Sequence, residues 1–215
     1  LALRAGCGRL IAFVDISANG ATEFHVIFLL AFIIMKDNKE AIGFERNMKD
    51  GDIISIDCGV TLDGFCGDAA YTFTVGEVSE DVRRLLRTTE EALYKAIEKA
   101  VTGNRLGDIG HCIEHYCRSK GYGIVRELSG HGIGKRMHED PQVDNYGYRH
   151  TGILLQEGLC LAIEPMVTMG SSKIFLNNAD RWAIHTKDRQ RAAHFEHTSV
   201  VRRGTAEILS KSPTP

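Results

Sequence analysis

The chain has 215 residues and a formal net charge of −2, with 43% hydrophobic and 25% charged residues. This length is enough for a single large domain with a sizeable core, and the composition is ordinary for a globular protein. The near-neutral charge leaves no basic footprint, so we expect neither nucleic-acid recognition nor binding to a membrane surface.

Six cysteines occur without a CxxC pair and without the density of a disulfide framework. This usage favours a reducing compartment, so we expect a cytoplasmic protein. The apolar run at residues 26–35 is half of the ~20 residues that a membrane helix needs. We expect a buried strand or a short core helix there.

The regular elements begin clearly at residue 52. Residues 52–60 and 65–75 are β-rich, and Asp63-Gly64 between them suits a hairpin turn. Apolar periodicity predicts one helix over residues 79–101, with Ser79 as its N-cap, and a second from Asp108 to near Gly121.

Four more β-like runs follow the second helix. They cover residues 123–128, 160–169, 182–187 and 193–201. Strands, two helices and strands again predict an α+β domain, in which helices cover one face of an antiparallel sheet.

Acidic residues interrupt these strands. Asp57 and Asp68 lie on the two strands of one hairpin, where like charges that close need a cation or a shared proton. Glu164 and Glu196 each lie inside an apolar strand, where burial is costly unless the charge is neutralised. If each acid is considered alone, however, the simplest interpretation is a residue on an edge strand that faces solvent.

The four acids occur together with His131, which lies in the glycine-rich stretch "SGHGIGKRMHEDP" at residues 129–141. Four carboxylates balance the charge of two divalent ions, and oxygen ligands with one histidine suit Mn, Co, Fe or Zn. Such a pair of ions lowers the pKa of a bridging water from ~15.7 to about 7 and polarises a carbonyl. The set therefore predicts hydrolysis at the N-terminus of a peptide.

These stretches, in this order, resemble the bacterial-type (type I) methionine aminopeptidases. The resemblance covers residues 49 to 210 and rests on "GDIISIDCGV", "DGFCGDAAYTF", "GHGIGKRMHEDP", "AIEPMVTMG" and "WAIHTKDRQRAAHFEHT". It implies the pita-bread fold, a pseudo-twofold α/β arrangement with a central antiparallel sheet. Residues 49–215 would form the catalytic domain, and residues 1–48 a shortened, poorly matching part of the same domain.

The resemblance also implies a role for each metal-site residue. Asp57 would chelate one of two divalent ions (Co, Mn, Fe or Zn), and Asp68 and Glu196 would bridge both. His131 and Glu164 would bind the second ion, and Glu164 would also shuttle the proton of the attacking water.

Three further residues would contact the substrate, which the resemblance implies to be the N-terminal methionine of a peptide or nascent chain. His138 would donate a hydrogen bond to the scissile carbonyl, a contact worth roughly 3–4 kcal/mol when lost. Met137 and Trp182 would line the pocket for the methionine side chain. The ribosome is a candidate partner, and we expect a monomer.

The chain departs from this family upstream of the first metal aspartate. There the family carries a substrate-contacting histidine, at a spacing that lands on Lys39, and residues 36–47 contain no histidine. Two alternatives therefore stay open: an inactive pita-bread module that binds peptides or the ribosome, and a related aminopeptidase or prolidase of different specificity. Against a prolidase, Lys135-Arg136 stands where those relatives usually show another histidine.

The remaining histidines and the cysteines beside the metal aspartates have simpler interpretations. We expect Cys58 and Cys66 to be core thiols rather than ligands. Strand alternation places His194 on the same face as Glu196. Surface or supporting positions are expected for His111, His115, His150, His185, His194 and His197.

Overall fold

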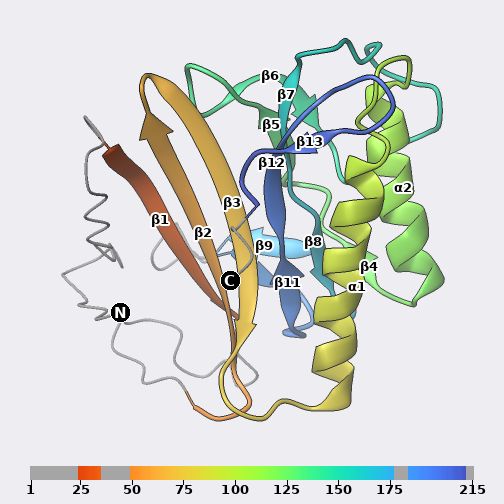
Figure 1. Ribbon diagram of the computed structural model, residues 1–215. Coiled ribbons are helices and arrows are strands. Elements are labelled where there is room, and N and C mark those ends of the chain that lie inside the picture. The colour runs from red at the N-terminus through yellow and green to blue at the C-terminus, as the bar shows by residue number, and fades with distance from the viewer. Residues whose placement is uncertain (1–23, 35–48, 177–183, 212–215) are drawn as a thin grey trace.

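The structure is a computed structural model that describes residues 24–34, 49–176 and 184–211. Its main feature is an eight-stranded antiparallel sheet of order β1-β2-β3-β12-β7-β5-β6, with β13 paired to β12 (Figure 1). The strands are β1 (Phe24–Ile34), β2 (Ile53–Leu62), β3 (Phe65–Thr74), β12 (Glu196–Val200), β7 (Cys160–Ile163), β5 (Gly130–Gly132), β6 (Glu139–Val143) and β13 (Glu207–Ile208).

Two helices and two small sheets complete the described fold. The helices are α1 (Glu80–Ile97) and α2 (Leu106–Ser119). One small sheet has the order β11-β8-β4, from Ala192–His194, Met166–Thr168 and Gly123–Ile124; the other pairs β10 (Ile184–Thr186) with β9 (Ile174–Leu176). All the ladders are antiparallel, as the sequence predicts.

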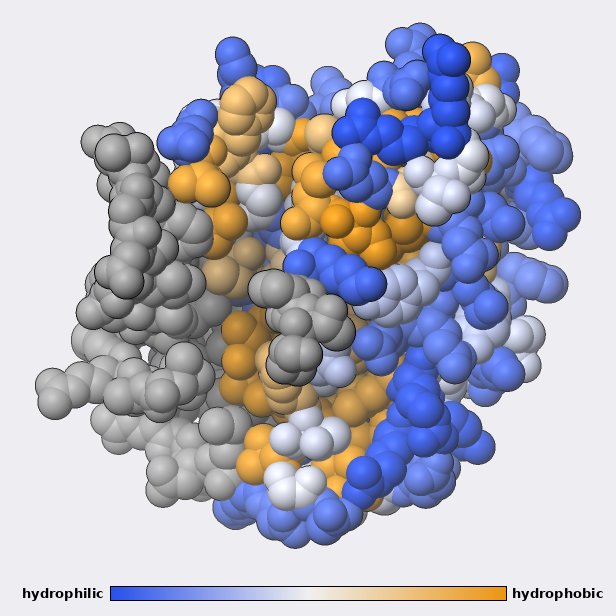
Figure 2. Space-filling view, viewed as in Figure 1, coloured by the Kyte–Doolittle hydropathy of each residue, from blue (hydrophilic) through white to orange (hydrophobic). Residues whose placement is uncertain are grey.

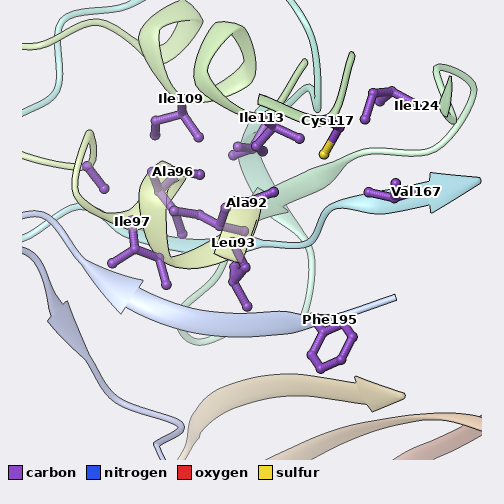
Figure 3. Close-up of a cluster of buried hydrophobic side chains, with 14 of the residues drawn as sticks. Ala92, Leu93, Ala96, Ile97, Ile109, Ile113, Cys117, Ile124, Val167 and Phe195 are labelled. Carbon is purple, nitrogen blue, oxygen red and sulfur yellow. The ribbon is translucent and has the colours of Figure 1, made fainter. Parts of the chain in front are cut away.

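The hydrophobic core lies between the helices and the strands. Figure 3 shows Ala92, Leu93 and Ala96 of α1 and Ile109 and Ile113 of α2 turned toward one another and toward the strands. Both helices bury one stripe, as the 3.6-residue periodicity predicts. Both helices cover the same face of the sheets and leave the opposite face uncovered.

The helix boundaries differ slightly from the sequence expectation. The first α-helix ends at Ile97 rather than near Val101. The second begins at Leu106, and Asp108 is its third residue, where its Oδ2 accepts a hydrogen bond of 2.8 Å from the Arg105 backbone N–H. Asp108 thus caps the helix from inside its first turn.

The hairpin between β2 and β3 forms as predicted. Asp63 and Gly64 both have positive φ, 50° and 79°, and every residue from Ile53 to Leu62 pairs with one from Thr74 to Phe65. Residues 26–34 of the predicted apolar run belong to a strand, β1, which pairs with β2. Three strands therefore run side by side at this edge of the sheet (Figure 1).

Two of the predicted strands are each broken in two. The run 160–169 divides at Glu164-Pro165 into β7 and β8, and the run 193–201 divides at Phe195 into β11 and β12. Proline has no N–H to donate to a ladder, so the strand cannot continue through Pro165. Because β7 pairs with β12 and β8 with β11, the neighbouring strands leave the large sheet together and enter the small one.

The strands β5 and β6 were not predicted, because their sequence is rich in glycine and polar residues. Glycine is needed here for close backbone approach. A Cβ on Gly130 would lie 2.2 Å from the Ala162 carbonyl oxygen, and one on Gly132 would lie 2.1 Å from the Asp140 carbonyl oxygen. The strand predicted at residues 123–128 is shorter than expected, because only Gly123–Ile124 form a strand, β4.

Apolar side chains also reach the surface along β3, as Figure 2 shows. Phe65, Tyr71 and Phe73 are exposed and alternate with the buried Asp68, Ala70 and Thr72 on the same strand. Large apolar side chains on one face of β3 are thus partly exposed, whereas Asp68, Ala70 and Thr72 on the other face are buried. Among the described residues, no helix is both long and apolar enough to cross a membrane.

The close approach at Gly130 gives a stability prediction. Gly130→Ala should lower the free energy of unfolding by about 1–3 kcal/mol, because the added methyl group must push β5 away from β7. Chemical denaturation measures this loss. Gly67→Ala is the matched control, since its Cβ would meet only the Val60 Cγ2 at 3.7 Å; equal losses in both variants would contradict the packing described.

Candidate metal centre

The β2–β3 hairpin places two carboxylates on one face of the sheet. Asp57 pairs with Ala70, and Asp68 pairs with Gly59. Directly paired residues share a face, and residues two apart on one strand do so as well. Asp57 and Asp68 therefore point to the same side, as their spacing across the turn predicts.

The neighbouring strand adds a third acid to this face. Ala70 of β3 pairs with Asp57 on one side and with Glu196 of β12 on the other. The three residues form a row across the sheet, with the small alanine between the two acids. Glu196 is 2% exposed, so its charge lies in a dry environment.

The same register carries across to His131. Thr198, two residues after Glu196, pairs with Ala162 of β7, which in turn pairs with His131 of β5. Glu164 follows Ala162 by two residues, at the break between β7 and β8. The structure thus brings all five predicted ligands to one face of the sheet.

That face is the one opposite the helices. Leu161 and Ile163 alternate with Ala162 along β7, and both belong to the core cluster formed with α1 and α2. The five predicted ligands therefore lie on the side of the sheet opposite α1 and α2.

The imidazole of His131 faces two of the carboxylates. Its Nε2 lies 3.9 Å from Asp68 Oδ2 and 3.9 Å from Glu164 Oε1. Its Nδ1 lies 2.9 Å from the Gly132 carbonyl oxygen, so we assign the ring hydrogen to Nδ1, which donates it to that oxygen. This tautomer leaves the Nε2 lone pair directed at the acids.

Two groups of side chains are close enough to share an ion. In the first, ligand atoms of Asp68, His131 and Glu196 lie within 4.8 Å of one another; in the second, those of Glu164, His194 and Glu196 do so. Glu196 belongs to both groups. This geometry suits a carboxylate that bridges two positions.

Two threonines fix the backbone around the acids. The Thr198 hydroxyl donates to the Asp68 carbonyl oxygen and accepts from the Asp68 N–H, both at 2.8 Å. The Thr72 hydroxyl likewise donates to the His194 carbonyl oxygen at 2.7 Å and accepts from its N–H at 3.0 Å. These paired bonds replace ladder bonds where the strands diverge.

Burial, with help from neighbouring charges, raises the pKa values of Asp57, Asp68 and Glu196. Burial raises the pKa of Asp57 to about 7; His194 opposes this rise, and the negative charges of Asp68 and Glu164 add to it. Burial also raises the pKa of Asp68 and, together with Glu164 and the two aspartates, holds the pKa of Glu196 well above its usual range. Without a cation the group holds protons that carboxylates normally release.

The donor set fits a divalent cation. Among the described residues, Glu196 Oε1 is buried and has no hydrogen-bond partner. Buried polar atoms are almost always satisfied, and a bound ion would satisfy this one while neutralising the neighbouring carboxylates. Carboxylate oxygens with imidazole nitrogen suit Mn, Co, Fe or Zn.

Comparison with known proteins supports the same interpretation. The sequence pattern of metallopeptidase family M24 matches residues 14–203. The chain belongs to metallopeptidase family M24. Its family membership makes the acids and His131 a candidate divalent metal site of a peptidase rather than an unexplained acidic cluster.

Two M24 relatives that match much of the chain carry the same name. A methionine aminopeptidase of Clostridium acetobutylicum is 50% identical over 165 residues, covering 77% of this chain and 66% of the relative. Another, of Clostridium perfringens, is 45% identical over 185 residues, covering 85% and 74%. The matched part of this chain thus spans about two thirds to three quarters of these relatives.

A solved structure confirms the fold. The crystal structure of a methionine aminopeptidase from Thermotoga maritima superposes with a TM-score of 0.79 at 42% identity, covering 86% of this chain and 74% of that one. The pita-bread fold expected from the sequence motifs is therefore confirmed for this M24 chain.

The glycine-rich loop forms the rim of the site. The Cys66 N–H donates to the Gly134 carbonyl oxygen at 2.6 Å, which ties the loop to the hairpin. Met137 lies against Gly59, because a Cβ there would be 2.6 Å from the Met137 Cε. His138 is exposed, and its ring centroid lies 4.4 Å from that of His131.

Two of the sequence expectations fall outside the described residues. Trp182 is one of them, so its expected place in the methionine pocket stays a prediction. The other is the stretch 36–47, where the family histidine is missing. The division at residue 48 likewise stays a prediction.

His194 takes the supporting position, which was one of the two expected for it. It is 6% exposed, and its Nε2 lies 3.3 Å from Glu164 Oε2. Burial lowers the pKa of His194, but its hydrogen bond with Glu164 and the charge of that acid outweigh burial and raise it. The signal was available, since alternation along the strand put His194 on the face of Glu196.

The other described histidines lie elsewhere. His197 points to the helix side, with its Nε2 3.3 Å from the Tyr94 hydroxyl. His111 and His115 stack on α2 with centroids 5.7 Å apart, and the His150 side chain is 85% exposed. Cys58 and Cys66 are half-buried and lie outside the core cluster, so they are not the core thiols expected; burial raises the pKa of the Cys58 thiol.

The orphaned carboxylate oxygen gives a prediction about metal addition. Adding Mn²⁺ or Co²⁺ to metal-stripped protein should raise its melting temperature, since an ion at 100 times its Kd adds about 2.7 kcal/mol of stability. Glu196→Gln should abolish most of this rise, because it removes the residue common to both groups. Differential scanning calorimetry measures the shift; an equal rise in the variant would contradict the site.

The raised pKa values give a prediction about pH. An acid whose folded pKa exceeds its unfolded value binds protons preferentially in the folded state, so stability falls as pH rises between the two values. For Asp57 this window runs from about 4 to about 7. Metal-free protein should lose stability across it, and Asp57→Asn should lose less. Denaturation at several pH values tests this, and parallel losses in both proteins would contradict it.

Proposed function

We propose that this chain acts as a methionine aminopeptidase, which hydrolyses the bond after an N-terminal methionine in peptides and nascent proteins. The observation that carries the proposal is the convergence of Asp57, Asp68, His131, Glu164 and Glu196 on one face of the sheet. The named relatives at 45% to 50% identity support the substrate class.

We propose further that the five residues hold two divalent ions. Glu196 would lie between them, since it belongs to both groups of ligand atoms. When bound, such ions lower the pKa of a water molecule and polarise a carbonyl oxygen. The donor set suits Co, Mn, Fe and Zn and does not select one of them.

The chain's own residues would then manage the proton and the carbonyl. Glu164 would take the proton from the attacking water and pass it to the leaving amine, as its place among both histidines and the acids allows. His138 would donate a hydrogen bond to the carbonyl oxygen of the scissile bond. Its exposed ring next to His131 supports this assignment, because it lies at the mouth of the site.

Met137 would contact the methionine side chain of the substrate. It covers Gly59 directly beside Asp68, where a bound N-terminal residue would enter. We propose that Trp182 also lines the pocket for the methionine side chain. A peptide or nascent-chain N-terminus is the partner proposed, with the ribosome as its source, and we propose a cytoplasmic monomer.

One observation favours a second function. Residues 36–47 lack the histidine that the family uses near the scissile bond. A binding module that recognises N-termini without cleaving them would not need it. Four clustered carboxylates argue against that function, because their mutual repulsion has no use without an ion.

The activity prediction uses a short peptide. Metal-stripped protein should release no methionine from Met-Ala-Ser, and addition of Co²⁺ or Mn²⁺ should start release. Asp68→Asn should lose both metal binding and turnover, whereas His138→Ala should keep the metal and lose roughly 10²–10³-fold in kcat, because it removes a hydrogen bond made to the developing oxyanion. Chromatography of free methionine and elemental analysis measure the two effects.

His115→Ala is the control, since His115 is exposed on α2 on the helix side of the sheet. It should match the unmodified protein. Metal-loaded, folded protein that binds Met-Ala-Ser without cleaving it would favour the binding module, and cleavage of Ala-Pro peptides in preference would favour a prolidase-like specificity.

A further inference from the structure

We propose that Asn145 is a positioning residue for the reaction: its side chain holds the backbone of Glu164 and so aims the Glu164 carboxylate into the metal centre. Asn145 lies two residues after the end of β6 and belongs to none of the motifs that predict the ligands. The inference rests on the proposed function and deepens it, because Glu164 is the residue proposed to move the proton.

The contact is a hydrogen bond from a side chain to the main chain. The Asn145 Nδ2 donates to the Glu164 carbonyl oxygen at 3.0 Å. Asn145 is 0% exposed, and a hydrogen bond away from bulk water is stronger than the same bond at the surface. The two residues are 19 positions apart in the sequence, so the bond joins separate parts of the fold.

Glu164 lies where the strand ladders stop. β7 pairs with β12 as far as Ile163, and β8 begins its ladder with β11 at Met166. Pro165, between them, has no N–H to donate. The backbone of Glu164 is therefore outside the ladders that hold its neighbours, and the amide of Asn145 supplies a hydrogen bond that no strand provides.

Asn145 is itself held by its two neighbours in the chain. The guanidinium carbon of Arg126 lies 3.9 Å from the centroid of the Tyr146 ring. The backbone on both sides packs on Gly110 of α2, where a Cβ would lie 2.4 Å from the Asp144 carbonyl oxygen and 2.3 Å from the Tyr146 carbonyl oxygen. The donor therefore projects from a segment that is fixed against a helix.

The Glu164 side chain is held at two further points. Its Cγ lies close to Gly130, where a Cβ would be 3.3 Å away, and its Oε2 lies 3.3 Å from His194 Nε2. If the carbonyl oxygen is released, the peptide plane after Glu164 can rotate and carry the carboxylate with it. A displacement of ~1 Å in a reacting group can cost on the order of 10²-fold in rate.

The second amide atom of Asn145 supports the same role. Its Oδ1 is buried and has no hydrogen-bond partner among the described residues. An unpaired buried acceptor costs stability, and a leucine of similar volume would avoid that cost. An amide at this position is thus explained by what its N–H group does, which is to hold Glu164.

The experiment compares Asn145→Leu with the unmodified protein. Leucine fills a similar volume but cannot donate a hydrogen bond. In Co²⁺-loaded protein, kcat for Met-Ala-Ser should fall about 10- to 100-fold, because the proton-transfer group is displaced. KM should change by less than about twofold, since the proposal gives Asn145 no contact with the peptide.

Titration with Co²⁺ gives a second readout that needs no peptide cleavage. Glu164 is also a proposed ligand of one ion, so Asn145→Leu should weaken one of the two binding steps about tenfold and leave the other unchanged. Titration calorimetry measures both steps. Asn145→Ala should give the same two results, and its smaller side chain carries the test if the leucine variant does not fold.

Asn104→Leu is the matched control. The Asn104 Nδ2 donates to the Lys99 carbonyl oxygen at 3.0 Å, a bond of the same kind and length that lies before α2 and away from the metal-site residues. This variant should lower the melting temperature but keep kcat and both Co²⁺ binding steps.

A loss of kcat together with a weakened Co²⁺ step in Asn145→Leu, and in neither respect in Asn104→Leu, supports the proposal. A lower melting temperature with kcat and both Co²⁺ affinities unchanged would mean that Asn145 only stabilises the fold, which overturns it. If metal-loaded, unmodified protein cleaves no peptide, the peptidase function is refuted, and the Co²⁺ titration alone then decides the positioning role. A protein that binds no Co²⁺ would refute both.

Discussion

Repulsion among buried carboxylates is the constraint on which the rest of this structure depends. Asp57, Asp68, Glu164 and Glu196 lie on one face of a sheet, and the surrounding protein withdraws water from them. The helices bury the opposite face, so the stability gained in the core offsets the strain of the charged one.

The backbone brings these acids together by two local devices. One is the paired break at Glu164-Pro165 and Phe195, where neighbouring strands pass from the large sheet into the small one. The other is the close approach of β5 to β7 that glycine allows, which sets His131 beside the acids. Both devices alter the direction of a chain without adding a loop, so the ligands stay on rigid elements.

Much of this was predictable where the signal is local. The hairpin at Asp63-Gly64, the two helices and the clustering of four acids with His131 follow from turn chemistry, periodicity and misplaced charge. The strand breaks were not predicted, because an apolar run looks the same whether it stays in one sheet or changes sheets. The strands β5 and β6 depend on distant partners and carry no periodic pattern of their own. The partner of His194 was not predicted, because Glu164 lies thirty positions away in the sequence.

Ala70 affects the shape of the site, although it carries no charged or reactive group. It stands between Asp57 and Glu196 in the row across β2, β3 and β12, and strands about 4.8 Å apart put the two acids about 10 Å from each other at their backbones. Its methyl group adds little volume between the two acids. Ala70 therefore shapes the volume in which ions and the end of a peptide would meet. Replacing Ala70 with side chains of increasing size, from serine to leucine, would fill that volume in steps and leave every predicted ligand unchanged.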